Sequence, residues 1–211
     1  NNKTTGDDYP YYISCRFYLP YRISRIRDML NEKEKLGIED FKRMITDQHS
    51  AYAALLTPHI LKLKTRQADM SKTESAALEL LSGWDYNMSA DIAAPSVFEF
   101  FRTTFPRKLL RDELGDLYSQ MPERISEYYI YRILQPGGED AWIDDVSTPE
   151  QESLDDIIYK SFKECVAALA DSCGSDPAGW KWGGMHTLTL VHPMSKVKIL
   201  DRIFGLNSAT F

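Results

Sequence analysis

The amino-acid sequence predicts a mainly α-helical chain with one short strand near residues 185–191. Apolar residues recur every three or four positions from Pro20 onward, which is the period of an amphipathic helix. Residues that begin and end helices lie at the edges of these segments. The stretch "MHTLTLV" instead alternates with the period of a strand. The 211 residues, of which 43% are hydrophobic and 27% charged, suffice for one substantial core.

The overall charge and the length of the apolar runs argue against two classes of partner. A net charge of -6 opposes binding to a phosphate backbone, because nucleic-acid affinity comes from clustered Lys and Arg. No apolar run approaches the ~18 residues of a membrane span. We therefore expect neither a nucleic acid nor a membrane as a partner.

The pattern divides the chain into three segments. Residues 1–19 are expected to form a loop or extended segment, residues 20–175 a helical domain, and residues 176–211 a Trp/His strand segment with a return helix. The first helix starts near Pro20, which suits a first turn. Its expected apolar face consists of Ile23, Ile26, Met29 and Leu30.

A longer helical pattern lies between Ile38 and Leu56. It should end or kink at Pro58, because proline removes a backbone donor and clashes with the preceding turn. His49 is expected on one face of this helix. It lies ten residues from His59, whereas a helical metal pair is separated by four. The apolar residues of the pattern are Ile38, Phe41, Met44, Ile45, Tyr52, Leu55 and Leu56.

Capping residues predict where two further helices begin. Ser71 and Glu74 have the spacing of a capping box, in which each side chain accepts a hydrogen bond from the other residue's backbone, and Gly83 is placed as the C-cap. Thr148 and Gln151 have the same spacing, so the last long helix is expected to begin at Thr148.

Prolines are expected to separate three short helices between these two boxes. Pro95 suits a first turn, whereas Pro106 and Pro122 each separate one helix from the next. The last long helix carries Cys165 on its apolar stripe, where we expect a small core residue. The three cysteines have no CxxC spacing, so they predict neither a disulfide framework nor a zinc site.

The stretch "GWKWGGMHTLTLVHP", residues 179–193, holds two of the four tryptophans and two of the four histidines. In a strand, His186 and His192 would stand roughly 20 Å apart, at ~3.3 Å per residue. Two zinc-bound nitrogens each lie ~2.1 Å from one ion, so these histidines cannot share a metal. We expect the tryptophans to pack a seam between helix and strand, and each histidine to make a local hydrogen bond. A histidine metal site stays as the weaker alternative.

Four segments are similar, in this order, to one family over nearly the whole chain. They are "NNK" followed by "YPYY", then "PYRISRIRDMLNEKEKLGIEDFKRMITDQHSAYAALLTPHI", then "LLSGWDYNMSADIAAPSVFEFFR", and finally "WKWGGMHTLTLVHP". The chain resembles the penicillin acylases (penicillin amidases), which are N-terminal-nucleophile hydrolases. The resemblance implies an internal fragment of the larger chain, formed mostly by the helical region of an αββα hydrolase, with residues 1–19 leading from its catalytic sheets.

The resemblance also implies a reaction. The intact protein would be a precursor cut into two chains, and the larger would begin with a serine that attacks a linear amide while its own α-amine acts as base. That serine is absent here, because the chain begins with Asn1, and Ser14 and Ser24 have no free α-amine. We therefore expect the fragment alone to be inactive. Its expected partners are the rest of the same precursor and a small acyl-amide substrate.

Two residues match functional positions of the family. Asn1, the first residue of "NN", corresponds to the side-chain donor of the oxyanion hole. Arg22, in "YRISRI", corresponds to a supporting arginine beside the nucleophile. From residue type alone, Asn1 would be a turn former at a chain end and Arg22 an ordinary solvated residue at a helix start.

Several properties stay open at this point. The residues "YISC" occupy the place where some members have an acidic calcium ligand, so we expect no cofactor in this chain, while calcium stays open for the intact enzyme. Analogy with the family implies a periplasmic or secreted protein. The acyl group is open among phenylacetyl, glutaryl and long-chain acyl-homoserine lactone. The alternative function is a non-catalytic helical interaction module on the same scaffold.

Overall fold

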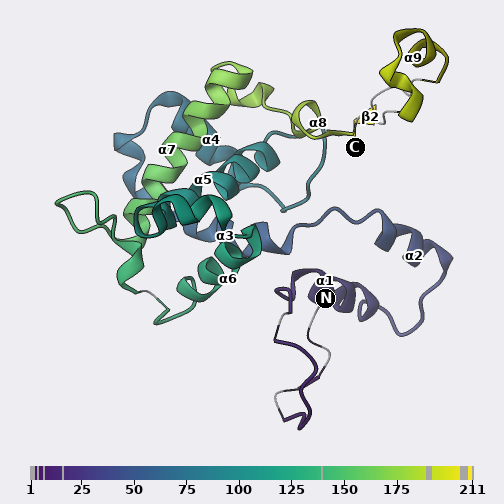
Figure 1. The fold of residues 1–211 in the computed structure, drawn as a ribbon, viewed down its shortest axis with the longest axis horizontal. Coiled ribbons are helices and arrows are strands. Elements are labelled where there is room, and N and C mark those ends of the chain that lie inside the picture. Colours follow the sequence, from purple (N-terminus) through teal and green to yellow (C-terminus); the bar gives the residue numbers. More distant parts are fainter. Residues whose placement is uncertain are drawn as a thin grey trace.

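The computed structural model describes residues 3, 5–6, 8–15, 17–138, 140–188, 192–204 and 209–210. In these residues the chain is mainly α-helical, as the sequence predicts (Figure 1). The α-helices are α1 (Tyr21–Leu30), α2 (Ile38–Ile45), α3 (Ala51–Leu61), α4 (Lys72–Ser82), α5 (Ala94–Leu114), α6 (Glu123–Ile133), α7 (Leu154–Cys173), α8 (Trp182–Met185) and α9 (Lys198–Phe204).

Short 3-10 helices and one strand pair complete the described structure. The 3-10 helices are η1 (Lys62–Asp69), η2 (Gly115–Gln120), η3 (Ala141–Ile143), η4 (Pro177–Gly179) and η5 (Pro193–Lys196). The strands β1 (Thr187–Leu188) and β2 (Ala209–Thr210) pair antiparallel, with Thr187 opposite Thr210. Among the described residues, no helix is long and apolar enough to cross a membrane.

The core lies where α3, α4, α5 and α7 meet, and α5 packs most extensively on α7. Aromatic side chains fill much of it. The rings of Phe101 and Phe105 stack at 5.2 Å, and Trp84 packs on Phe98 at 5.7 Å. Cys165 is completely buried in α7, as predicted. The largest fully buried side chains are Trp180, Phe98, Phe101, Phe105, Phe162, Leu56, Ile60, Leu63, Leu78, Leu81, Leu109 and Leu110.

Pro106 does not separate two helices, so that prediction was wrong. It lies inside α5, which continues for eight more residues to Leu114. A proline within a helix costs about 3 kcal/mol, because a backbone hydrogen bond is lost and the ring meets the preceding turn. Here Phe105 and Leu109 are buried on either side of it in the contact with α7, and their burial offsets that cost.

The two capping boxes had different outcomes. Ser71 caps α4 as predicted: its hydroxyl accepts from the backbone N–H of Glu74, whose carboxylate accepts from the backbone N–H of Ser71. Gly83 ends the helix, also as predicted. The box at Thr148 was wrong, because α7 begins five residues later, with Ser153 as its N-cap and Asp156 as the reciprocal partner.

The long helix expected between Ile38 and Leu56 is broken. Helix α2 ends at Ile45 and α3 begins at Ala51, with Ser50 as its N-cap. The intervening backbone pairs with the segment after α4 instead. The N–H of Ser50 donates to the Tyr86 carbonyl at 2.9 Å, and the N–H of Met88 donates to the Gln48 carbonyl at 3.0 Å. His49 therefore lies in a β-bridge with Asn87 and not on a helix face.

Pro58 does not end the helix in this part of the chain. It lies inside α3, which runs on to Leu61 and then tightens into η1. Ile60, two residues beyond the proline, is completely buried. As at Pro106, contacts with the core override the local effect of the proline.

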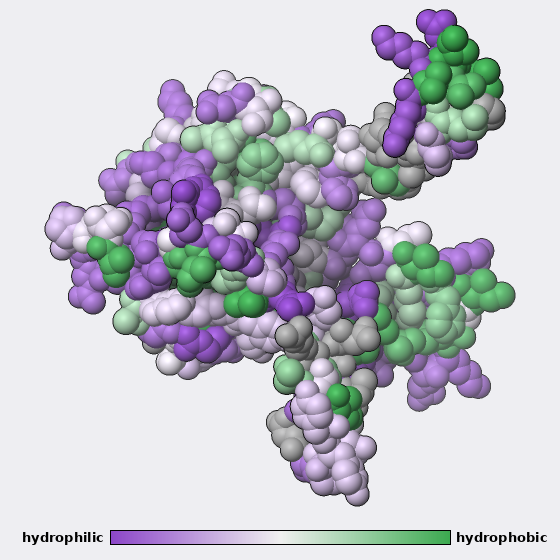
Figure 2. All heavy atoms as spheres, viewed as in Figure 1, coloured by the Kyte–Doolittle hydropathy of each residue, from purple (hydrophilic) through white to green (hydrophobic). Residues whose placement is uncertain are grey.

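Helices α1 and α2 project from the helical body (Figure 1). The apolar stripe of α2, formed by Ile38, Phe41 and Ile45, is 50–84% exposed, and Figure 2 shows hydrophobic side chains gathered there and over α9. Of the apolar face expected for α1, only Met29 is buried, while Ile26 and Leu30 are more than one-third exposed. Periodicity thus located α1 and the start of α2, but burial does not follow their apolar stripes.

The Trp/His stretch is structural in its described part. Trp180 is completely buried, and its indole N–H donates to the Gly174 carbonyl at 2.7 Å, which attaches the stretch to the end of α7. His186 stacks on Trp182 at 4.8 Å, and His192 Nδ1 accepts from the N–H of Met194. Strand β1 covers residues 187–188 of the predicted strand, and residues 189–191 lie outside the described residues.

Phe98 is buried whereas Phe41 is half-exposed, so we expect replacement of Phe98 to cost more stability. Phe98→Ala should lower the free energy of unfolding by about 3–5 kcal/mol, because it leaves a cavity in the core. Phe41→Ala on half-exposed α2 is the matched control and should cost less than about 1 kcal/mol. Urea denaturation of the 211-residue chain measures both. Equal losses would contradict the placement of α2 outside the core.

Candidate functional site

The sequence singled out Asn1 and Arg22 for chemistry, and of these two the structure describes Arg22. Asn1 lies outside the described residues. Arg22 is the second residue of α1, and its side chain is exposed. With the other residues that the structure describes, the Arg22 guanidinium forms neither an ion pair nor a hydrogen bond. It is therefore available for a group that approaches this end of α1.

An aromatic contact joins the start of α1 to the core. The ring of Tyr21 packs on Tyr52 of α3 at 5.3 Å, and Tyr52 packs edge-on against Phe98 of α5 at 6.0 Å. Burial raises the pKa of both tyrosines well above the ordinary value, so their hydroxyls stay protonated at neutral pH. Arg22 thus follows directly after a residue that is packed against the core.

One turn further along α1, an ion pair fixes the helix a second time. Arg25 Nε donates to Asp47 Oδ2 at 2.9 Å, and Arg25 Nη2 donates to Asp47 Oδ1 at 2.6 Å. The hydrogen bond from Arg25 lowers the pKa of Asp47, so the carboxylate stays charged at neutral pH. Asp47 lies between α2 and α3, directly before the bridge that holds His49. The pair therefore ties α1 to the segment that leads into α3.

A hollow of about 390 Å³ lies between α1 and this segment. Its wall combines the two arginines with apolar and polar groups, so it offers cationic donors beside an apolar surface. The residues that line it are Tyr21, Arg22, Arg25, Ile26, Met29, Met44, Asp47, His49, Ser50, Ala51 and Tyr52. Such a mixed lining suits a small molecule with an apolar part and a polar carbonyl.

A group of carboxylates around Arg102 lies close to Tyr21. Arg102 of α5 donates to Glu99 at 2.8 Å and forms a short contact with Glu123, and Glu127 lies 3.7 Å from the same guanidinium. Burial raises the pKa of Glu127, and repulsion from Glu123 adds to this, because one arginine faces three carboxylates. The Arg102 group stabilises the contact of α6 with α5.

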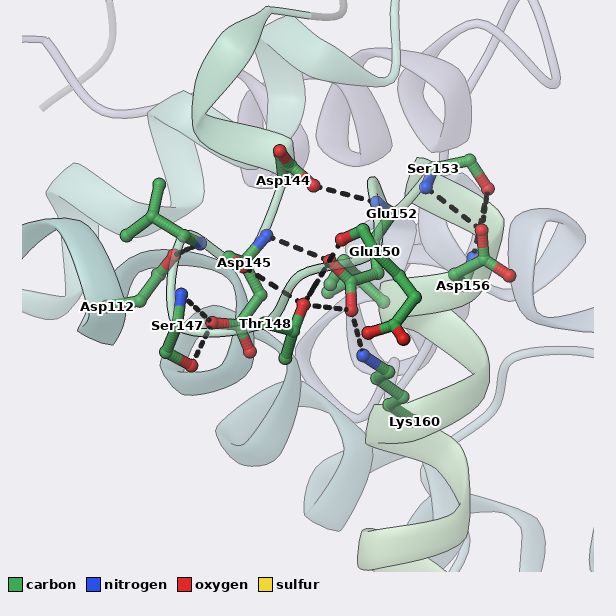
Figure 3. A network of polar contacts seen from close by, with 12 residues as sticks. Asp112, Asp144, Asp145, Ser147, Thr148, Glu150, Glu152, Ser153, Asp156 and Lys160 are labelled. Atoms are coloured by element: carbon green, nitrogen blue, oxygen red, sulfur yellow. Dashed lines mark hydrogen bonds and ion pairs between the residues drawn. The ribbon is translucent and has the colours of Figure 1, made fainter.

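A second polar network closes the connection between α6 and α7 (Figure 3). Glu152 accepts from the Thr148 hydroxyl at 2.8 Å and pairs with Lys160, and its own backbone N–H donates to Asp144 at 2.7 Å. The contact with Lys160 lowers the pKa of Glu152. Thr148 therefore orders this loop instead of capping a helix.

Neither network forms a metal site. Within the described ranges, no group of three His, Cys, Asp or Glu side chains has the arrangement to hold an ion. In the loop of Figure 3, backbone N–H groups and Lys160 occupy the carboxylates. Among the described residues, the ring of His186 stacks on Trp182.

Sequence reasoning singled out Arg22 but not the ion pair of Arg25 with Asp47 that lies beside it. Tyr21, Arg25 and Met29 are spaced by four, so they share one face of α1, and this face is the one that packs. The expected face was chosen from aliphatic residues alone. The spacing of a tyrosine, an arginine and a methionine was the available signal, but Asp47 as the partner depends on the break between α2 and α3.

The chain combines a helical body with a projecting helix, α1, that carries an exposed arginine. Comparison of its sequence with known proteins shows the family to which it belongs. Residues 1–210 match the family model of penicillin amidase, so the chain belongs to the penicillin amidase family. The family resemblance inferred from the sequence is therefore confirmed.

Several relatives share the name acyl-homoserine lactone acylase QuiP. The chain is 27% identical over 206 residues to the protein of Pseudomonas syringae pv. syringae, which covers 88% of this chain and 24% of the relative. It is 24% identical over 213 residues to the protein of Pseudomonas aeruginosa, which covers 93% of this chain and 25% of the relative. The chain thus spans about a quarter of the length of these relatives.

The capping box of α7 predicts a pH-dependent contribution to stability. Hydrogen bonds from Ser153 lower the pKa of Asp156 to about 2, and Arg66 pairs with it at 2.7 Å. Because the folded-state pKa lies below the ordinary value of 3.8, this stability is present above about pH 4 and is lost as the pH falls toward 2. Asp156→Asn should cost about 1 kcal/mol at pH 7, allowing for partial exposure, and almost nothing near pH 2.

Asp155→Asn, one residue earlier in the same turn, is the matched control. Urea denaturation of the three proteins between pH 2 and pH 7 measures the difference. A cost for Asp156→Asn that does not change across this range would show that the charge of Asp156 has no part in the capping box.

Proposed function

We propose that this chain is the helical part of a penicillin-acylase-like amidohydrolase that cleaves a linear amide bond through an acyl-enzyme. The observation that carries the proposal is the family match over residues 1–210. Relatives that bear the name of an acylase support the same class of reaction. The exposed guanidinium of Arg22 beside a hollow of about 390 Å³ supports a role for this end of α1 near a substrate.

In the proposed reaction, the nucleophile is an N-terminal serine that this chain does not contain. Its hydroxyl oxygen attacks the amide carbonyl carbon, and its α-amine takes the hydroxyl proton. The side-chain N–H of Asn1 donates to the oxyanion that forms, which is worth about 3 kcal/mol in such sites. The amine product leaves with the proton, and water then hydrolyses the acyl-serine ester.

In this scheme Arg22 supports the site by its charge and is not itself the nucleophile or base. Its guanidinium has no partner among the described residues, so it is free to pair with groups around the nucleophile. The 211-residue chain alone is proposed to be inactive. The proposed partners are the remaining parts of the same precursor and a small acyl-amide substrate, and the proposed location is periplasmic or secreted.

Among the acyl groups that the sequence leaves open, we propose long-chain acyl-homoserine lactone as the first substrate class to test. The relatives' shared name supports this order. Phenylacetyl and glutaryl amides are the other two classes. Calcium is proposed only for the intact enzyme and takes no part in the steps above.

The second candidate function is a non-catalytic helical interaction module. The observation that favours it is the exposed apolar stripe of α2, where Ile38 and Ile45 are 76% and 84% exposed. The coding sequence before Asn1 separates the two candidates. A serine at a processing junction, followed by this chain, supports the enzyme, whereas its absence supports the module.

Hydrolysis assays test the proposed function directly. The full-length gene product and the 211-residue chain are each incubated with an acyl-homoserine lactone, a chromogenic phenylacetyl amide and a glutaryl amide. We expect release of the amine from at least one substrate by the full-length protein and none by the chain alone. Activity of the chain alone would refute the proposed nucleophile, and a correctly processed full-length protein that cleaves none of the three would refute the amidohydrolase.

Substitutions of the two site residues test their roles in the full-length protein. Asn1→Ala should lower kcat about 10²–10³-fold, because an oxyanion donor acts mainly in the transition state. Asn2→Ala is its control and should change kcat less than about 3-fold. Arg22→Ala should lower kcat about 10²-fold through misplacement of neighbouring groups, whereas Arg27→Ala, on the same helix, should have little effect. Equal effects of Asn1→Ala and Asn2→Ala, or of the two arginine variants, would contradict the assigned roles.

A further inference from the structure

We propose that the ion pair between Arg25 and Asp47 positions Arg22 for the reaction. Arg25 and Asp47 are then positioning residues. This inference rests on the proposed function, because it gives the pair a role only through Arg22. Three features of the structure carry it: the face on which α1 packs, the geometry of the pair, and the attachment of Asp47 to the core.

The packed face of α1 is narrow. Tyr21, Arg25 and Met29 follow each other at intervals of four, and Met29 is the residue of α1 that is fully buried. Neighbouring Ile26 and Leu30 are more than one-third exposed. An apolar contact is non-directional, so it restricts the rotation of a helix about its own axis less than a hydrogen-bonded contact does. Beside the ring contact of Tyr21 with Tyr52, a directional interaction would therefore define the rotational setting of α1 more closely.

The Arg25–Asp47 pair is such an interaction. Two N–H groups of one planar guanidinium meet the two oxygens of one carboxylate, at 2.9 and 2.6 Å. This bidentate geometry fixes orientation as well as distance. The side chains are 30% and 17% exposed, so solvent screens the pair less than it screens a fully exposed one. Lysine in place of Arg25 would keep the positive charge but lose the pair of parallel N–H donors.

Asp47 in turn is held by the body of the fold. It is followed by Gln48, His49 and Ser50, whose backbone pairs with the segment after α4. That segment carries Trp84, which is buried against Phe98. The connection from Arg25 through Asp47 therefore leads to the core in a few residues. A projecting helix thereby receives a fixed orientation.

Orientation matters because Arg22 is long and lies one turn before Arg25. A rotation of α1 by roughly 10° moves a guanidinium about 6 Å from the helix axis by about 1 Å. A misplacement of about 1 Å in a catalytic arrangement can lower the rate about 10²-fold. The pair thus controls the position of Arg22 without contact with the substrate.

A double-mutant cycle in the full-length protein tests the proposal. Asp47→Asn should lower kcat about 10-fold with KM changed less than about 2-fold, and Arg25→Lys should act in the same direction. In the Arg22→Ala background, Asp47→Asn should change kcat less than 2-fold, because its effect passes through Arg22. Arg66→Gln is the control, since it removes another partly exposed guanidinium–carboxylate pair, the one that joins η1 to α7.

A full effect of Asp47→Asn in the Arg22→Ala background, or no effect in the wild type, overturns the positioning role while the proposed function stands. If the wild type is inactive, the proposed function fails instead. If Arg22→Ala has no effect in an active enzyme, the role assigned to Arg22 fails and the positioning role falls with it. Hydrogen exchange of the α1 amides tests, in every case, whether the Arg25–Asp47 pair restrains α1. Asp47→Asn should speed exchange in residues 21–30 at least several-fold and Arg66→Gln should not, and unchanged exchange overturns the proposal.

Discussion

The contact between α5 and α7 is the constraint on which the rest of the helical body depends. Phe101, Phe105 and Leu109 of α5 are buried beside the stripe of α7 that includes Phe162 and Cys165. Burial of aromatic and aliphatic surface supplies most of the stability of such a contact, at roughly 25 cal/mol per Å² of apolar area. This explains why α5 continues through Pro106. The local cost of the proline is smaller than the loss that a break in the packed stripe would cause.

The same reasoning separates what the sequence could predict from what it could not. Ser71, Glu74 and Gly83 gave the correct limits of α4, because a capping box acts between residues three positions apart. The start of α7 was predicted five residues too early. Thr148 has the spacing for a cap, but its hydroxyl donates to the carboxylate of Glu152 in the folded loop. Local patterns succeed where the partner is local and fail where tertiary structure supplies another.

The candidate site shows the same limit. Arg22 was singled out through the family resemblance, and periodicity located the helix that carries it. Asp47 was assigned to the interior of one long helix, but that helix is broken where the backbone of residues 48–50 pairs with residues 86–88 and Ser50 caps α3. This pairing joins residues almost 40 positions apart. No pattern within a single helical segment could reveal it, so the partner of Arg25 was out of reach.

The way in which α1 is attached follows from these constraints. A larger apolar face would hold α1 more strongly, but apolar packing alone would leave its rotation poorly defined. A bidentate ion pair contributes little net stability when it is partly exposed, and it nevertheless restricts the geometry of both partners. In the role proposed for Arg22, whose guanidinium has to point in one direction, restriction of orientation matters more than added stability. The aromatic contact of Tyr21 with Tyr52 then supplies the burial, and the pair of Arg25 with Asp47 supplies the direction.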